Sequence, residues 1–138
     1  MAAAKAATLA TLARLRRLDD DAARQALGHA AMAEHRAHLD VDEAHSRRTH
    51  ELAAATHAGA PPGALARWLP VVGLAIATAQ ATLALKESER AAAAVGLARC
   101  KAALKAVATL QAERDKVSRR TEARRTQLRL DEMGRRPG

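Results

Sequence analysis

The N-terminal half of the chain carries apolar residues at a helical spacing. The series begins with Leu9, Leu12, Leu15, Leu18 and Ala22. It continues as a heptad repeat of alternating four- and three-residue steps through Leu27, Ala31, Glu34, His38, Val41, His45, Arg48, Leu52 and Ala55. Since residues 5–57 contain no Pro and one Gly, we predict a helix over about 4–57. Several heptad positions are polar, so this helix needs a partner along that face.

The strongest helix-breaking segment lies at residues 58–63, which read Ala-Gly-Ala-Pro-Pro-Gly. Such a concentration of Gly and Pro predicts a turn in which the chain reverses. Residues 64–69 then form a short helical lead-in, and Pro70 is expected in the first turn of a second helix over about 70–132. Residues 133–138, which include Gly134 and Pro137, are expected to be a frayed tail.

The second half carries a more regular apolar pattern. Its first positions are Leu69, Val72, Ile76, Ala79 and Leu83, and the same register resumes at Leu97, Cys100, Leu104 and Val107. Between them Lys86 and Arg90 occupy heptad positions, which loosens the register there. A change of phase then brings Leu110, Val117 and Leu128 onto the apolar face.

Together these patterns predict an all-α protein in which two long helices form an antiparallel coiled-coil hairpin, as a single domain over residues 1–138. Composition agrees, because Ala, Leu, Glu, Lys and Arg make up 86 of the 138 residues. Phe and Tyr are absent and Trp68 is the one Trp. Aromatic and β-branched residues are too scarce for a β-sandwich or barrel, and an α/β enzyme is almost as strongly disfavoured.

The net charge of +8 is concentrated in the second half. Residues 1–60 contain eight basic and eight acidic residues, whereas residues 61–138 contain fifteen and seven. This excess indicates an acidic protein, a nucleic acid or an anionic membrane surface as the partner, although high-GC genomes also yield Arg-rich chains. The single cysteine, Cys100, gives no disulfide framework, and the N-terminal residues lack an apolar signal-peptide region, so we expect a cytoplasmic protein.

No phosphate-binding loop, catalytic triad or paired-carboxylate pattern is present, so we expect neither an enzyme nor a cofactor. His38, Asp42 and His45 share a helix face, and His50 and His57 repeat the seven-residue spacing. A metal site of this kind needs a further ligand and supporting contacts, so none is predicted. Residues 68–85 carry no formal charge and reach the lower length limit of a membrane span, but they contain Pro70 and several polar residues.

Basic residues are predicted to gather at the end of the hairpin that holds both termini. An antiparallel arrangement places the N-terminal group near the C-terminal group, and either could bind carboxylates or phosphates. The candidate partner-binding residues are Arg14, Arg16, Arg17, Arg119, Arg120, Arg124 and Arg125. No aromatic residues lie among them, so base stacking is excluded as a mode of binding.

The chain resembles the FliJ family of flagellar export proteins, which is related to the YscO-type stalks of virulence secretion systems. The resemblance rests on the segment Leu9–Leu18 followed by acidic residues, on Leu65-x-x-Trp68-Leu69-Pro70 after the central turn, and on the Arg-rich end of the second helix closing in Leu130-Asp131-Glu132. It covers nearly the whole chain, although family members carry more Glu, Gln and aromatic residues.

The resemblance implies a cytoplasmic two-helix stalk that binds the ring of the export ATPase through its terminal end. It further implies contact with the export-gate membrane protein, peripheral association with the inner face of the membrane, and help in delivering substrates or export chaperones. Two alternatives stay open. One is a basic coiled-coil protein associated with nucleic acid, although nucleic acid is a less favoured partner than the export ATPase. The other is a single-pass membrane protein using residues 68–85. The pattern does not separate flagellar from virulence-type secretion.

Overall fold

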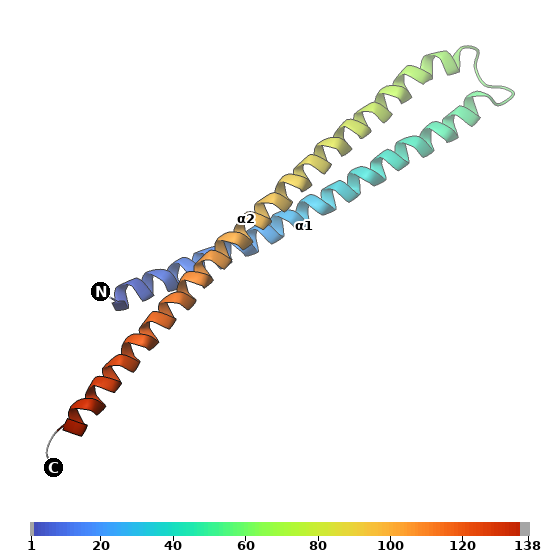
Figure 1. The fold of residues 1–138 in the computed structure, drawn as a ribbon. Coiled ribbons are helices and arrows are strands. Elements are labelled where there is room, and N and C mark those ends of the chain that lie inside the picture. The colour runs from blue at the N-terminus through green and yellow to red at the C-terminus, as the bar shows by residue number, and fades with distance from the viewer. Residues whose placement is uncertain (1, 136–138) are drawn as a thin grey trace. The chain divides into compact units, whose positions relative to one another are not determined.

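The computed structural model describes residues 2–135 and contains two long helices over that range. α1 spans Ala2–Ala55 and α2 spans Ala64–Arg135, and no strand occurs among these residues. The two helices run in opposite directions from the turn and pack against each other, as Figure 1 shows. The fold is therefore the all-α helical hairpin that the apolar periodicity predicts.

The chain divides into two compact units. One, here called the terminal unit, combines Met1–Asp21 with Arg99–Gly138, and the other, the hairpin unit, comprises Ala22–Ala98. Each unit pairs a segment of α1 with a segment of α2, so each has its own interhelical contacts.

The turn occupies residues 56–63, two residues earlier at its start than predicted, because α1 ends at Ala55. Gly59 and Gly63 have φ angles of 108° and 75°, in the region that favours glycine. Arg67 links the first turn of α2 to the preceding turn, since its Nη2 donates a hydrogen bond to the carbonyl of Pro62 at 3.1 Å.

Pro70 does not open the second helix. It lies inside α2, which begins at Ala64 and runs without interruption to Arg135, so the predicted lead-in and tail belong largely to one helix. Residues 136–138 of the predicted tail lie outside the described range. The first turn of α2 is retained because Leu65 and Trp68 are half-buried. Their packing offsets the hydrogen bond that the ring of Pro70 denies to the helix.

The buried positions of α1 follow one heptad series over most of its length. They are Leu9, Ala13, Arg16, Asp20, Ala23, Leu27, Ala30, Glu34, Ala37, Val41, Ala44, Glu51 and Ala55, each buried or half-buried. We call this series the α1 seam. Its most buried members are small or charged, with Ala13 and Ala37 each 3% exposed and Asp20 4% exposed. Small side chains allow the helix axes to come close, but each contributes little apolar area to the interface.

The α1 seam corrects part of the predicted pattern. Leu15 and Leu18 are 52% and 58% exposed, because leucines three residues apart drift around a helix that needs 3.6 residues per turn. In the later series, the expected positions His38, His45, Arg48 and Leu52 are exposed. Their neighbours Ala37, Ala44 and Glu51 take the interior face instead.

The α2 seam agrees more closely with the prediction. Its members are Leu65, Trp68, Val72, Ile76, Ala79, Leu83, Lys86, Ala93, Leu97, Cys100, Leu104, Val107, Gln111 and Arg114. Leu69 is not among them, and the predicted change of phase is wrong. Leu110, Val117 and Leu128 are 51%, 60% and 63% exposed, while the original register continues through Gln111 to Arg114.

An ion pair between Glu34 of the α1 seam and the exposed Arg90 of α2 indicates the register of the hairpin unit. Arg90 Nε lies 3.3 Å from Glu34 Oε2. Because the helices are antiparallel, a step of seven residues back along α1 corresponds to a step of seven residues forward along α2. From the Glu34–Arg90 pair, such steps place Leu27 opposite Leu97 and Val41 opposite Leu83. The hairpin unit thus alternates apolar layers with a charged one.

Candidate partner-binding site

All seven candidate arginines belong to the terminal unit, where the structure separates them into two groups. Arg14, Arg16 and Arg17 lie on α1, and the other four lie near the end of α2. A groove in this unit is lined by Leu9 of α1 and Arg114 of α2, which shows where the two segments meet.

The expected single basic end is therefore not formed. Counting in opposite directions from Leu9 and Arg114 places Arg16 opposite Val107, whereas Arg119–Arg125 lie 12 to 18 residues further along α2. At about 1.5 Å per residue this separates the two groups by about 18–27 Å. The prediction failed because it aligned the two ends of the chain, although α2 has 72 residues and α1 has 54.

Within the N-terminal group, Arg16 has a structural position. It occupies the α1 seam, is half-buried, and has an Nη1 atom 3.5 Å from Asp19 Oδ2. Its Nε is buried with no hydrogen-bond partner among the described residues. Arg14 and Arg17 are exposed on either side of it. The side chain of Arg16 is 43% exposed, so its guanidinium group is less accessible than those of its two neighbours.

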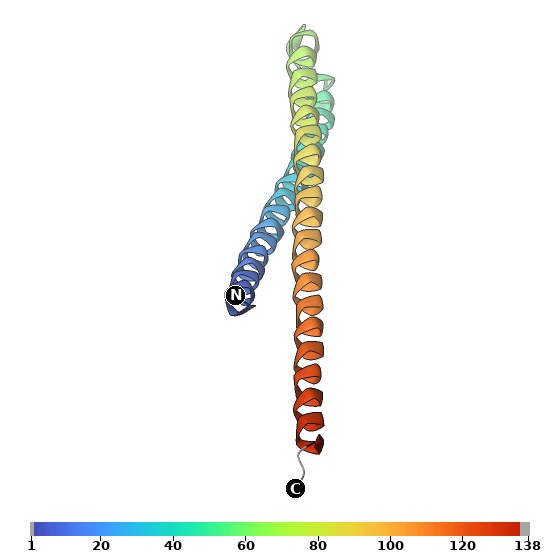
Figure 2. The same ribbon diagram turned by 60° about the vertical axis from the view of Figure 1, so that its left-hand side comes forward.

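The C-terminal group lies on a free helical segment. Residues 119–135, which we call the C-terminal extension, are all exposed. They follow Val117 and Ser118, each of which lines a groove shared with α1. Figure 2 shows this red end of α2 reaching past the N-terminal end of α1 in the terminal unit. The extension carries six arginines and three acidic residues.

Few intramolecular contacts occupy these arginines. Arg119 Nε donates to the carbonyl of Asp115 at 3.3 Å, within its own helix. In the described part of the chain, no ion pair involves Arg120, Arg124 or Arg125. Arg120 and Arg124 are four residues apart and so project from one helix face. The extension also exposes Leu128, Leu130 and Met133 by 63%, 54% and 65%.

A second cluster of charged side chains lies in the hairpin unit, and the sequence reasoning missed it. Glu34, His38, Glu87 and Arg90 come together from α1 and α2. The four-residue spacing of Glu34 and His38 could have indicated a shared face. Glu87 and Arg90 could be added only once the register of the two helices was known.

Part of α2 also satisfies the length and composition of a membrane span. An 18-residue window of this helix has a mean hydropathy of 1.6, and 6% of it is buried. Val71 and Leu74 of the uncharged segment are 65% and 69% exposed, while Val72 and Ile76 are on the α2 seam. The same segment thus presents apolar side chains to α1 and to solvent.

Comparison with protein-family models, with curated proteins and with solved structures gives no significant match for this chain.

Proposed function

We propose that this protein is a non-enzymatic helical stalk of a flagellar or related type III protein-export apparatus. In this proposal it binds the ring of the export ATPase and assists delivery of substrates or export chaperones to the gate. It acts in the cytoplasm, held at the inner face of the membrane through its partners.

The observation that supports the proposal is the C-terminal extension. Seventeen consecutive helical residues, 119–135, are exposed. Helices in proteins gain most of their stability from packing against other elements. This segment is therefore suited to packing against a second protein. Its form fits a slender element that enters a ring or groove.

The chemistry of the extension favours an acidic partner surface. Arg120 and Arg124 present guanidinium groups on one face, and such groups bind carboxylates through paired hydrogen bonds. The exposed side chains of Leu128 and Leu130 supply apolar contacts that a charged patch alone lacks. A mixture of apolar anchors and arginines is typical of protein–protein contacts, in which charge complementarity governs specificity.

The test is co-purification of the full chain with the export ATPase near physiological salt, with nonspecific duplex DNA as competitor. We expect the ATPase to retain the chain when DNA is added. Binding to DNA that displaces the ATPase, and that weakens steeply with salt, would instead identify a nucleic-acid-associated protein.

Two double charge-reversal variants, one in the C-terminal extension and one in the hairpin unit, test which part of the chain contacts the ATPase. Arg120→Glu with Arg124→Glu is expected to abolish retention, because it places like charges against the acidic surface. Arg47→Glu with Arg48→Glu makes the same change of net charge in the hairpin unit and should leave retention intact. Equal loss in both variants would mean that total charge, and not the extension, governs binding.

The apolar window of α2 supports one second candidate, a protein anchored in the membrane by that segment. It predicts that the chain is recovered from membranes only with detergent, with or without the ATPase. Extraction by salt or alkali alone would agree with the peripheral association proposed above.

A further inference from the structure

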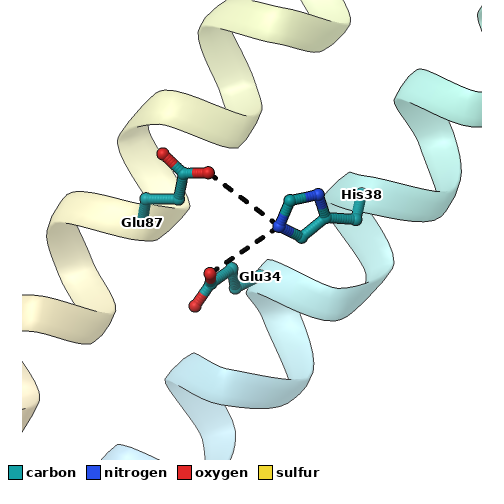
Figure 3. Close-up of side chains that lie close together, drawn as sticks. All are labelled: Glu34, His38 and Glu87. Atoms are coloured by element: carbon teal, nitrogen blue, oxygen red, sulfur yellow. Dashed lines mark ion pairs between the residues drawn. The ribbon is translucent and has the colours of Figure 1, made fainter.

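Three side chains that can bind a metal converge between the two helices of the hairpin unit. Glu34 and His38 lie on consecutive turns of α1, and Glu87 reaches toward them from α2, as Figure 3 shows. His38 Nε2 lies 3.7 Å from Glu34 Oε1 and 3.9 Å from Glu87 Oε1. All three ligand atoms lie within 4.8 Å of one another.

We propose that Glu34, His38 and Glu87 form a binding site for a divalent transition-metal cation of the zinc type. An imidazole nitrogen and two carboxylate oxygens are ligands that such cations accept, with water in the remaining position. Mg²⁺ and Ca²⁺ prefer oxygen ligands alone, so the central imidazole selects against them.

The distances allow coordination with small side-chain movements. Metal–ligand bonds of about 2.0–2.2 Å in a tetrahedral site place neighbouring ligand atoms about 3.4 Å apart. The separations of 3.7 and 3.9 Å from His38 exceed this value by a few tenths of an ångström. The two carboxylates lie within 4.8 Å of each other, so they must approach by up to about 1.4 Å. The side chains of His38 and Glu87 are each 52% exposed, so both can rotate inward and a cation can reach them from solvent.

The surroundings orient the least mobile ligand. The side chain of Glu34 is 17% exposed, and its Oε2 pairs with Arg90 Nε at 3.3 Å. That contact holds the carboxylate so that Oε1 faces His38. A supporting contact to the second oxygen of a carboxylate ligand is a usual feature of metal sites, because it fixes the direction of the coordinating atom.

A cation at this position would join α1 to α2. Glu34 and His38 belong to one helix and Glu87 to the other, so the three ligands meet only in the folded hairpin. Metal binding would then stabilise the hairpin unit by an amount that grows with the logarithm of the free cation concentration once this exceeds the dissociation constant. The site would act as a clamp in a seam that otherwise contains much Ala.

The experiment measures urea unfolding of the full chain by far-UV circular dichroism with Zn²⁺ or Mg²⁺ added. We expect Zn²⁺ to raise the unfolding midpoint, and to raise it further as Zn²⁺ is added beyond one equivalent, whereas Mg²⁺ at the same concentration should have no effect. Co²⁺ should give the visible absorption of a four-coordinate complex with one nitrogen ligand.

Two variants and a matched control decide the assignment. Glu87→Gln and His38→Gln should each lower the Zn²⁺ affinity at least tenfold, while the half-exposed side chains leave the metal-free dichroism spectrum unchanged. His45→Gln, on the same helix and also exposed, should bind as the parent does. The proposal is wrong if Zn²⁺ produces no shift, or if Glu87→Gln shows the same shift as the parent at every Zn²⁺ concentration.

Discussion

The ion pair between Glu34 and Arg90 offers a quantitative test of the register of the hairpin unit. A double-mutant cycle built from Glu34→Gln and Arg90→Gln isolates the interaction between these side chains. At their separation of 3.3 Å the attraction is about 5 kcal/mol for an effective dielectric constant of about 20. Desolvation of Glu34, whose side chain is 17% exposed, opposes this gain, and Arg90 is 55% exposed and screened by solvent.

These opposing effects lead us to expect a coupling free energy of about 1 kcal/mol. The assay is urea unfolding monitored by far-UV circular dichroism for the parent, both single variants and the double variant. The control is the cycle on Glu43 and Arg47, which form a 3.1 Å ion pair within α1 and are 67% and 65% exposed. That pair should give about 0.3–0.5 kcal/mol, as exposed pairs on one helix do.

The result that would refute the reasoning is a Glu34–Arg90 coupling of zero within error, with the Glu43–Arg47 coupling still measurable. The two helices would then not bring these side chains together in solution. The register that places Leu27 opposite Leu97 would lose its support.

Three further predictions use the same unfolding assay. Ala37→Leu should destabilise the chain by about 1–3 kcal/mol, because Ala37 is 3% exposed and a larger side chain there forces the helices apart. The control variant Ala53→Leu, at an exposed site on the same helix, should change stability little. Pro70→Ala should raise stability by about 1–3 kcal/mol, since it restores a hydrogen bond inside α2. Gly28→Ala should raise stability by about 0.5–1 kcal/mol, because a Cβ there meets no atom within 4 Å. A decrease in either of the last two would contradict the helix bounds or the open space at these sites.

The sequence predicts the hairpin well because both of its main signals are local. A long stretch with almost no Gly or Pro indicates helix, and the Gly–Pro cluster before Ala64 indicates the turn. The α2 seam is also local information, since Val72, Ile76 and Val107 are large apolar residues that leave little choice of face.

The α1 seam is harder to predict because the two competing faces differ little in hydrophobicity. Ala30 and Ala31 are both small and apolar, and both are half-buried, so neither position fixes the phase. The choice of Ala37 over His38 for the interior depends on contacts with α2. Glu34 keeps its place on the seam because Arg90 pairs with it across the interface, and that information resides in the other helix.

The candidate site shows the same limit. The Arg residues themselves are evident in the sequence, but their grouping in space depends on how far α2 extends beyond the N-terminal end of α1. Arg16 belongs to the seam, and Arg120 and Arg124 belong to a fully exposed segment of α2. Only the paired lengths and the register reveal this difference.

We propose that the C-terminal extension, and not the apolar face of the hairpin unit, contacts the export ATPase. Site-specific photo-crosslinking tests it directly, with the photoreactive residue placed at Leu128 or at Leu74. These two positions are matched in exposure, at 63% and 69%. We predict a crosslink to the ATPase from position 128 and none from position 74. A crosslink from position 74 alone, or from neither position in a chain that still folds, would contradict the account.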